Sequence, residues 1–271
     1  MRHHTPEALA MAGIERLSAA FSSRNASGKP AFVAFLTAGY PSLASTVPSM
    51  LAMQAAGVDV IEVGIAFSDP LADGGTIAKA SEGALANGVS LAWTLRAVRD
   101  ARAAGVTVPV VLMGYINPIL AYGQAKLVKD AAAAGVDGFI IVDLLPEDAG
   151  GFLSQCAGAG LAFVPLVAPT TPDARLPLIA STASAFVYCV SVTGVTGART
   201  ELPPDLADFL RRVRAHVKLP LAVGFGLSTP AHVAAVGGLA EGVVMGSAIV
   251  RAMEEGHSAL EKLLKEVVPP R

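Results

Sequence analysis

The hydrophobic pattern of the chain consists of short apolar runs separated by longer stretches with helical, alanine-rich periodicity. About eight of the runs indicate strands, and their residues are continuously apolar instead of alternating. Continuous runs are typical of parallel strands that helices cover on both faces. The predicted strands lie at 31–39, 55–64, 108–115, 133–143, 161–169, 184–191, 219–226 and 237–247.

Three of these segments, at 55–64, 133–143 and 237–247, repeat one pattern. In each, the end of a helix is followed by a glycine that terminates it, a short polar stretch and an apolar strand. About eight β-then-α units in roughly 250 residues is the size of a (β/α)8 barrel. A doubly wound open sheet is the alternative, but it would normally carry G-x-G-x-x-G after the first strand, where this chain has "TAGYP". We therefore predict an α/β protein, a single-domain (β/α)8 TIM barrel over residues 31–271, with an N-terminal helical extension over residues 1–30.

Composition and charge narrow the class of protein. The 271 residues are 53% hydrophobic and 15% charged. The formal net charge of −2 lacks the excess of positive charge that is typical of nucleic-acid-binding proteins. There is no apolar run of eighteen residues and no apolar core of the signal-peptide kind at the start, so we expect no membrane association. Two cysteines, Cys156 and Cys189, fit a reducing compartment. We expect a cytoplasmic location, or the plastid stroma if the source is a photosynthetic eukaryote.

Two carboxylates stand out against the apolar pattern. Glu62 lies between Ile61 and Val63 within the second predicted strand, where an ionised side chain is costly to bury. Asp73 follows eleven positions later, in the loop after that strand. In barrels of this kind the chemistry lies at the carboxyl ends of the strands, so both are candidate catalytic residues.

Two other acidic residues have an ordinary structural alternative. Asp69 precedes a proline and suits a turn, and Asp143 closes the fourth predicted strand, where it suits a cap on the following helix.

The last two predicted strands end in small residues that suggest an anion site. "VGFGLST" and "VVMGSAIV" place Gly226, Gly246 and Ser247 where a strand becomes a helix. Backbone N–H groups at helix N-termini bind anions, and the loops after strands seven and eight are a recurring phosphate position in this fold. For either stretch taken alone, turn formation is the alternative interpretation.

Four motifs in order resemble those of one enzyme family: "IEVGIAFSDPLADGGTI", "VSVTGVTGAR", "VGFGLST" and "GSAIV". From about Ala31 to Arg251 the chain resembles the tryptophan synthase α subunit and the closely similar stand-alone indole-3-glycerol phosphate lyases. The resemblance implies a retro-aldol cleavage of indole-3-glycerol phosphate into indole and glyceraldehyde 3-phosphate. In that reaction Glu62 would shuttle protons and Asp73 would accept the indole N–H, and Tyr188, which would line the site near Glu62, is the third candidate catalytic residue.

The resemblance also implies a set of substrate contacts. Thr196 would belong to a lid that orients Asp73 on closing. The phosphate would be held by the N–H groups of Gly197, Gly226, Gly246 and Ser247. Phe35, Ile77, Met113 and Tyr115 are candidates for the flat indole pocket, with plain core packing as the alternative for each.

The sequence argues against two other aldolase mechanisms. A Schiff-base enzyme needs a lysine at a strand end, and none is found. A metal-dependent aldolase needs clustered ligands, and none of the five histidines lies at a carboxyl end of a predicted strand. We therefore expect no cofactor and no metal.

Three positions depart from the family pattern: Ala66, Gly75 and Leu145 stand where the family usually has proline. In two-subunit enzymes of the family these loops face the pyridoxal-phosphate β subunit, so the departures weaken the expected partnership. Three hypotheses stay open: a lyase that feeds a β subunit, a stand-alone lyase that releases indole, and a non-catalytic barrel that activates a β partner. The presence of both Glu62 and Asp73 argues against the third.

Overall fold

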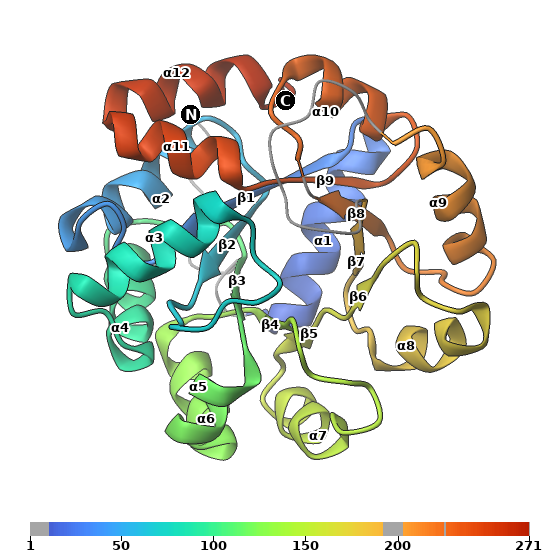
Figure 1. The fold of residues 1–271 in the computed structure, drawn as a ribbon, viewed down its shortest axis with the longest axis horizontal. Coiled ribbons are helices and arrows are strands. Elements are labelled where there is room, and N and C mark those ends of the chain that lie inside the picture. The colour runs from blue at the N-terminus through green and yellow to red at the C-terminus, as the bar shows by residue number, and fades with distance from the viewer. Residues whose placement is uncertain (1–10, 192–202, 225, 271) are drawn as a thin grey trace.

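A parallel sheet that curls into a barrel forms the centre of the molecule (Figure 1). The computed structural model describes residues 11–191, 203–224 and 226–270. Within these residues the sheet has nine strands in the order β5-β4-β3-β2-β1-β9-β8-β7-β6. The predicted α/β barrel is confirmed, with one refinement at its closure.

The fifth predicted strand forms two short pieces, β5 (Ala162–Phe163) and β6 (Leu166–Val167). Pro165 lies between them and has no N–H to donate to a ladder. β5 pairs with β4 on one side, and β6 pairs with β7 on the other. One segment therefore joins the two ends of the sheet, and the later strands are numbered one higher than their predicted order.

The other strands are parallel to one another and lie within the predicted segments. They are β1 (Ala31–Thr37), β2 (Val60–Gly64), β3 (Val110–Gly114), β4 (Gly138–Ile141), β7 (Val187–Val190), β8 (Leu221–Gly224) and β9 (Gly242–Met245). In the register of the sheet Phe35 lies opposite Glu62, and Glu62 lies opposite Val111.

Helices surround the sheet, as Figure 1 shows. They are α1 (Gly13–Ala26), α2 (Thr46–Ala55), α3 (Gly75–Ala86), α4 (Leu91–Ala103), α5 (Ile116–Tyr122), α6 (Gln124–Ala134), α7 (Gly150–Gly158), α8 (Leu176–Thr182), α9 (Leu206–Arg214), α10 (Pro230–Gly237), α11 (Ser247–Glu255) and α12 (His257–Val267), with 3-10 turns at Leu43–Ser45 and Asp173–Arg175. None of the helices in the described part of the chain is long and apolar enough to cross a membrane.

Each strand is buried on both of its faces. Phe32 and Leu36 of β1 belong to the core between sheet and helices. Val33 and Phe35, which alternate with them, belong to a second core inside the barrel. The two cores explain why the strands are continuously apolar in sequence.

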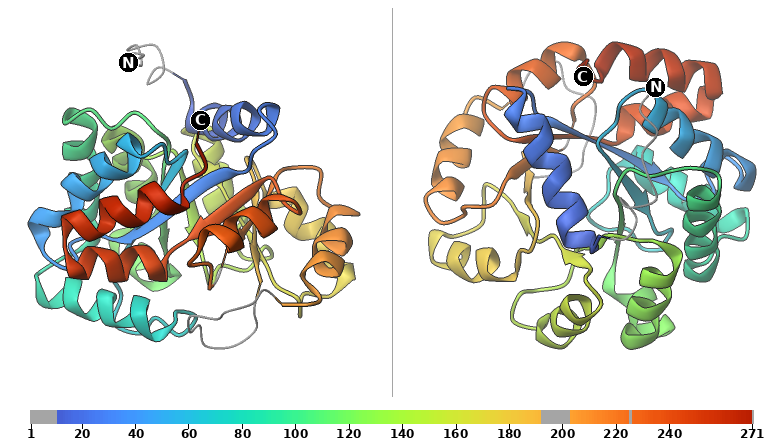
Figure 2. Two further views of the ribbon diagram at one scale, coloured as in Figure 1. Left: turned by 90° about the horizontal axis from the view of Figure 1, so that it is seen from above. Right: turned by 180° about the vertical axis from the view of Figure 1, so that it is seen from behind.

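Helix α1 closes the amino-terminal end of the barrel (Figure 2, right). Phe21 stacks on Phe186 with ring centroids 4.8 Å apart. Arg16 reaches from α1 to Asp137 at 2.6 Å, and Arg102 of α4 binds the same carboxylate at 2.7 Å. The Asp137 side chain is only 2% exposed, so two guanidinium groups compensate one deeply buried charge.

We expect Asp137→Ala to lower the free energy of unfolding by about 3–5 kcal/mol, because two buried guanidinium groups lose their counter-charge. Urea unfolding followed by circular dichroism measures this. The control is Asp100→Ala, whose carboxylate is 66% exposed and 4.0 Å from Arg99. That variant should change stability by less than about 0.5 kcal/mol. A loss below about 1 kcal/mol for Asp137→Ala would contradict the argument.

Candidate active site

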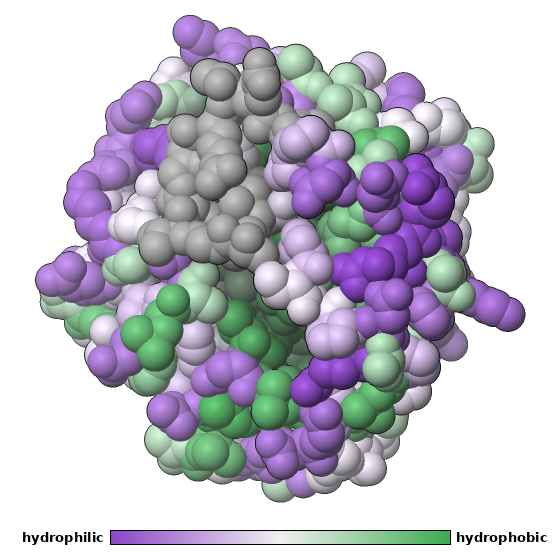
Figure 3. All heavy atoms as spheres, turned by 45° about the vertical axis from the view of Figure 1, so that its right-hand side comes forward, coloured by the Kyte–Doolittle hydropathy of each residue, from purple (hydrophilic) through white to green (hydrophobic). Residues whose placement is uncertain are grey.

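A hollow at the carboxyl ends of the strands contains both candidate carboxylates. Its lining residues come from strand ends and the loops that follow them: Phe35, Glu62, Asp73, Gly74, Ile77, Met113, Tyr188, Gly226, Val244, Gly246 and Ser247. The cavity is narrow, with a volume of about 50 Å³. Figure 3 shows the surface hollowed, with apolar side chains along the hollow.

The structure thus brings together most of the predicted site residues. Tyr115 lines an adjoining smaller hollow that shares Phe35, Asp73, Ile77 and Met113 with the first. Thr196 and Gly197 lie outside the described residues. The roles assigned to all these residues stay predictions.

Glu62 points into the barrel from the centre of β2. Glu62 is only 1% exposed, and none of the described residues forms a hydrogen bond with its Oε2. Burial raises the pKa of Glu62 to about 8, and the nearby negative charge of Asp73 adds to the effect. At neutral pH the group therefore holds a proton that it can donate.

Asp73 ends the loop between β2 and α3 and is partly exposed. Burial raises the pKa of Asp73 to about 6, while a hydrogen bond from the Tyr115 hydroxyl opposes the shift. The carboxylate is therefore largely ionised at neutral pH. One protonated and one ionised carboxyl group face the same hollow, an arrangement suited to two different chemical roles.

The loop that carries Asp73 is anchored at several points. The Ser81 hydroxyl accepts the Phe67 N–H at 2.8 Å and donates to the Phe67 carbonyl at 2.9 Å. The Tyr115 hydroxyl accepts the Ala72 N–H at 3.0 Å. Tyr115 therefore holds the loop with its polar end, a role that the indole-pocket prediction missed.

Helix α3, which follows the loop, is tied to α11. Arg251 of α11 donates to the Thr76 hydroxyl at 3.5 Å, and Lys79 and Glu254 form an ion pair at 2.5 Å. Helix α11 begins at Ser247, at the strand end predicted to hold an anion. These contacts therefore hold α3, and the Asp73 loop before it, next to the helix that starts at the predicted anion site.

Tyr188 fills the far wall of the hollow. A Cβ on Gly224 would lie 2.1 Å from the Tyr188 hydroxyl oxygen, so glycine is required beside this ring. Burial raises the pKa of Tyr188 well above its ordinary value, and the charge of Glu62 adds to the effect. The phenol therefore stays protonated. It is suited to binding or orienting a substrate and not to exchanging a proton.

The predicted phosphate end places the start of a helix at the hollow. Ser247 is the first residue of α11, and Gly246 precedes it at the cap. The amides of a first helical turn have no partner within the helix and suit an anion. Gly226 has φ of +79°, a conformation that favours glycine. All three residues are partly exposed.

Asp143 has a structural partner that differs from the prediction. Its Oδ1 accepts the Ile116 N–H at 2.7 Å, so it caps α5, which follows the neighbouring strand, and not the helix that follows it in the chain. The carboxyl ends of adjacent parallel strands meet at one edge, which explains why the cap crosses between units.

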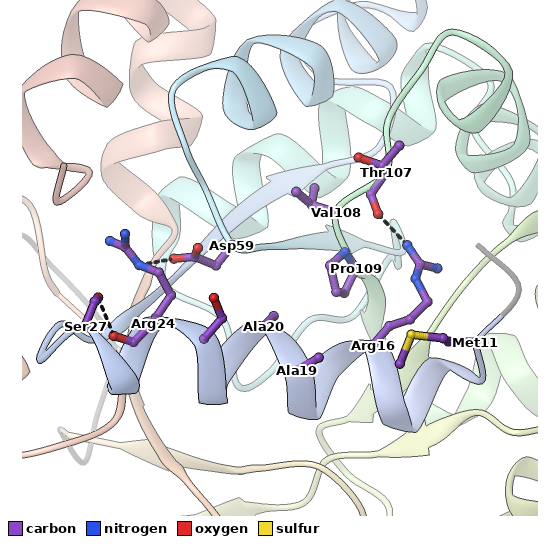
Figure 4. A pocket seen from close by; sticks show the side chains of 11 residues that line it. Met11, Arg16, Ala19, Ala20, Arg24, Ser27, Asp59, Thr107, Val108 and Pro109 are labelled. Atoms are coloured by element: carbon purple, nitrogen blue, oxygen red, sulfur yellow. Dashed lines mark hydrogen bonds and ion pairs between the residues drawn. The ribbon is translucent and has the colours of Figure 1, made fainter. Parts of the chain in front are cut away.

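A larger hollow, of about 390 Å³, lies at the opposite end of the barrel beneath α1 (Figure 4). Its charged groups are paired: Arg16 with Asp137 and with the Thr107 carbonyl, and Arg24 with Asp59 at 3.0 Å. Compensated charges offer no reactive group, so we place the chemistry in the smaller hollow. The described residues contain no cluster of histidine, cysteine and acidic side chains able to hold a metal.

Sequence reasoning missed three residues at or near the site: Thr37, which lines the smaller hollow, and Ser81 and Arg251, which hold the Asp73 loop and α3. Thr37 is the last residue of β1, and its place as a polar residue at the carboxyl end of an apolar strand was the available signal. Ser81 and Arg251 lie in helices, where only the packing of α3 reveals their contacts.

The raised pKa of Glu62 predicts a pH-dependent stability. Below pH 4.5 both folded and unfolded chains hold the Glu62 proton, and between 4.5 and 8 only the folded chain does. The free energy of unfolding should therefore fall as pH rises across this window, by on the order of 4 kcal/mol from this group. Urea unfolding between pH 5 and 9 should show a shallower decline for Glu62→Gln than for the wild type. Glu82→Gln, at an exposed position of α3, should follow the wild type; parallel curves for all three would refute the burial argument.

Comparison with known proteins agrees with this geometry. The family model described as "Tryptophan synthase alpha chain" matches residues 21–269. The tryptophan synthase alpha chain of Roseiflexus castenholzii is 48% identical over 90% of this chain and 94% of its own length, and that of Xanthomonas axonopodis pv. citri is 47% identical over 89% and 91%.

Among solved structures, Mycobacterium tuberculosis tryptophan synthase has a TM-score of 0.87 at 39% identity, covering 93% of this chain and 96% of that one. A tryptophan synthase complex from Pyrococcus furiosus has a TM-score of 0.80 at 40% identity, covering 88% and 96%. The chain belongs to the tryptophan synthase alpha chain family.

Proposed function

We propose that this protein cleaves indole-3-glycerol phosphate to indole and glyceraldehyde 3-phosphate by a retro-aldol reaction. The observation that carries the proposal is the pair of carboxyl groups in one hollow, with Glu62 protonated and Asp73 ionised at neutral pH. Family membership agrees with this chemistry.

Glu62 would act first as an acid and then as a base. Its proton goes to C3 of the indole ring, and the resulting carboxylate takes the proton of the side-chain hydroxyl next to the breaking bond. The C–C electrons return to the ring as the hydroxyl carbon becomes the aldehyde, so Glu62 ends the cycle protonated. A pKa near working pH suits both transfers.

Asp73 would stabilise the charge that develops on the ring. Protonation at C3 leaves positive charge on the indole nitrogen, and an ionised carboxylate that accepts the N–H bond favours that state. The neighbouring apolar side chains Phe35, Ile77 and Met113 suit the faces of a flat aromatic ring.

The far end of the substrate would be held by main-chain N–H groups at Gly226, Gly246 and Ser247. Gly197, and Thr196 in the proposed lid, complete this set as predictions on residues outside the described ranges.

A β subunit is the partner we propose. The Pyrococcus furiosus neighbour is a tryptophan synthase complex. Leu71, Leu120 and Leu145, which follow three neighbouring strands, are 94%, 56% and 52% exposed, and apolar side chains exposed on one rim suit a protein interface. Gly75 is the first residue of α3, a position that favours proline, so this chain starts α3 with less restraint than the family pattern.

We also propose that residues 31–271 act as one catalytic barrel, with residues 1–30 as its extension. The stacking of Phe21 inside the barrel end supports this division.

Two substitutions test the carboxylates. Glu62→Gln should reduce turnover by at least about 1,000-fold while substrate still binds, because the amide cannot exchange the proton. Asp73→Asn should lose about 10- to 1,000-fold, since the amide still accepts the N–H bond but carries no charge. Steady-state indole release and substrate affinity measure both, with Glu82→Gln as the control. Near-normal turnover of Glu62→Gln would sink the mechanism.

An indole-release assay of the purified chain, with and without an added β subunit, separates the remaining hypotheses. Slow cleavage that the β subunit accelerates supports the partnership. Fast cleavage by the chain alone supports a stand-alone lyase, and no cleavage in either setting refutes the proposed reaction.

A further inference from the structure

Thr37 places an unpaired hydroxyl beside the active-site hollow. It is the last residue of β1, lies opposite Gly64 in the register of β2, and is 2% exposed. Its Oγ1 has no hydrogen-bond partner among the described residues. Buried hydroxyl groups in folded proteins are normally satisfied by protein atoms or by ordered water.

The Thr37 side chain faces a hollow that is large enough for one water. About 20 Å³ is open to the centre of a water-sized sphere, and roughly 10–15 Å³ is needed to hold one water. The polar lining groups are Thr37, Asp73, Ser81 and Tyr115, and the other lining residues are Phe35, Gly64, Ile65, Ile77, Met113, Gly114 and Val142.

Two of the four polar groups already use their donors. Ser81 donates to the Phe67 carbonyl, and Tyr115 donates to Asp73. The Thr37 O–H remains as a donor, and the Asp73 carboxylate retains acceptor sites because an ionised carboxyl group has about four. A water between them would accept from Thr37 and donate to Asp73.

Asp73, Phe35, Ile77 and Met113 line both this hollow and the substrate hollow, so the two hollows adjoin. A water beside Thr37 would therefore lie in a hollow that the Asp73 carboxylate also lines. We propose that the hollow between β1 and the Asp73 loop binds one water, which links the Thr37 hydroxyl to Asp73, and that Thr37 is a positioning residue acting through this water. The water site stands by itself; its catalytic consequence rests on the proposed function.

A donor to the ionised form of Asp73 favours that form and opposes the effect of burial. Among the described residues, the other titratable groups that face Asp73 are Glu62 from β2, Tyr115 directly after β3 and Tyr188 from β7. A Thr37 substitution leaves these side chains unchanged, and comparison with Thr37→Ser isolates the effect of the hydroxyl group.

The test compares Thr37→Val, which keeps the shape and removes the hydroxyl, with Thr37→Ser, which keeps the hydroxyl. In Thr37→Val the acidic limb of kcat/KM should move up by about one pH unit, which gives about a fivefold loss at pH 6 and almost none at pH 8. Thr37→Ser should retain the wild-type profile. Thr94→Val removes a buried hydroxyl that bonds the Ser90 carbonyl in α4, and its profile should also match the wild type.

A crystal structure that resolves ordered water gives a readout independent of activity. Density within hydrogen-bond distance of both Thr37 and Asp73 should be present in the wild type and in Thr37→Ser, and absent in Thr37→Val. Its absence from the wild type, or a Thr37→Val profile that superimposes on the wild type, would overturn the inference. If the wild type cleaves no indole-3-glycerol phosphate, the proposed function fails and the density alone decides the water site.

Discussion

Glu62 carries a carboxyl group into a largely apolar barrel interior, and Oε2 has no hydrogen-bond partner among the described residues. Placing an ionised carboxylate there costs free energy, so the folded chain keeps the group protonated near neutral pH. The same desolvation that weakens the fold provides a carboxylic acid near neutral pH. Asp73, Tyr188 and the glycine-lined strand ends surround that one group.

The two ends of the barrel treat buried charge in opposite ways. At the amino-terminal end Arg16, Arg102 and Asp137 compensate one another within 2.7 Å, which fixes α1 and leaves no group free to react. At the carboxyl end no guanidinium group neutralises Glu62 among the described residues. Buried charges are therefore paired at one end, and an unneutralised carboxyl group lies at the other, as expected for a fold whose carboxyl-end loops carry function.

The position of Asp73 depends on one contact within its own β-then-α unit and on two contacts from other units of the barrel. Ser81 holds the start of its loop, Tyr115 holds the end, and Arg251 ties the following helix to α11. The role proposed for Asp73, acceptance of the indole N–H, needs such support, because small displacements of a charge-stabilising group weaken its effect on the transition state. This local geometry is compatible with the reaction of the family to which the chain belongs.

The sequence by itself determined the architecture and the principal residues. Continuous apolar runs specify parallel strands buried on both faces, and a carboxylate within such a run, as at Glu62, is detectable because burial of charge is costly. The motifs around Glu62, Gly226 and Ser247 identified the family before any coordinates. The tertiary structure decided what depends on neighbours far apart in the chain: the split at Pro165, the cap that Asp143 provides for α5, and the second role of Tyr115. It alone revealed Thr37 as a buried hydroxyl behind Asp73. These features arise where side chains of different β-then-α units meet, and local sequence periodicity carries no information about which side chains those are.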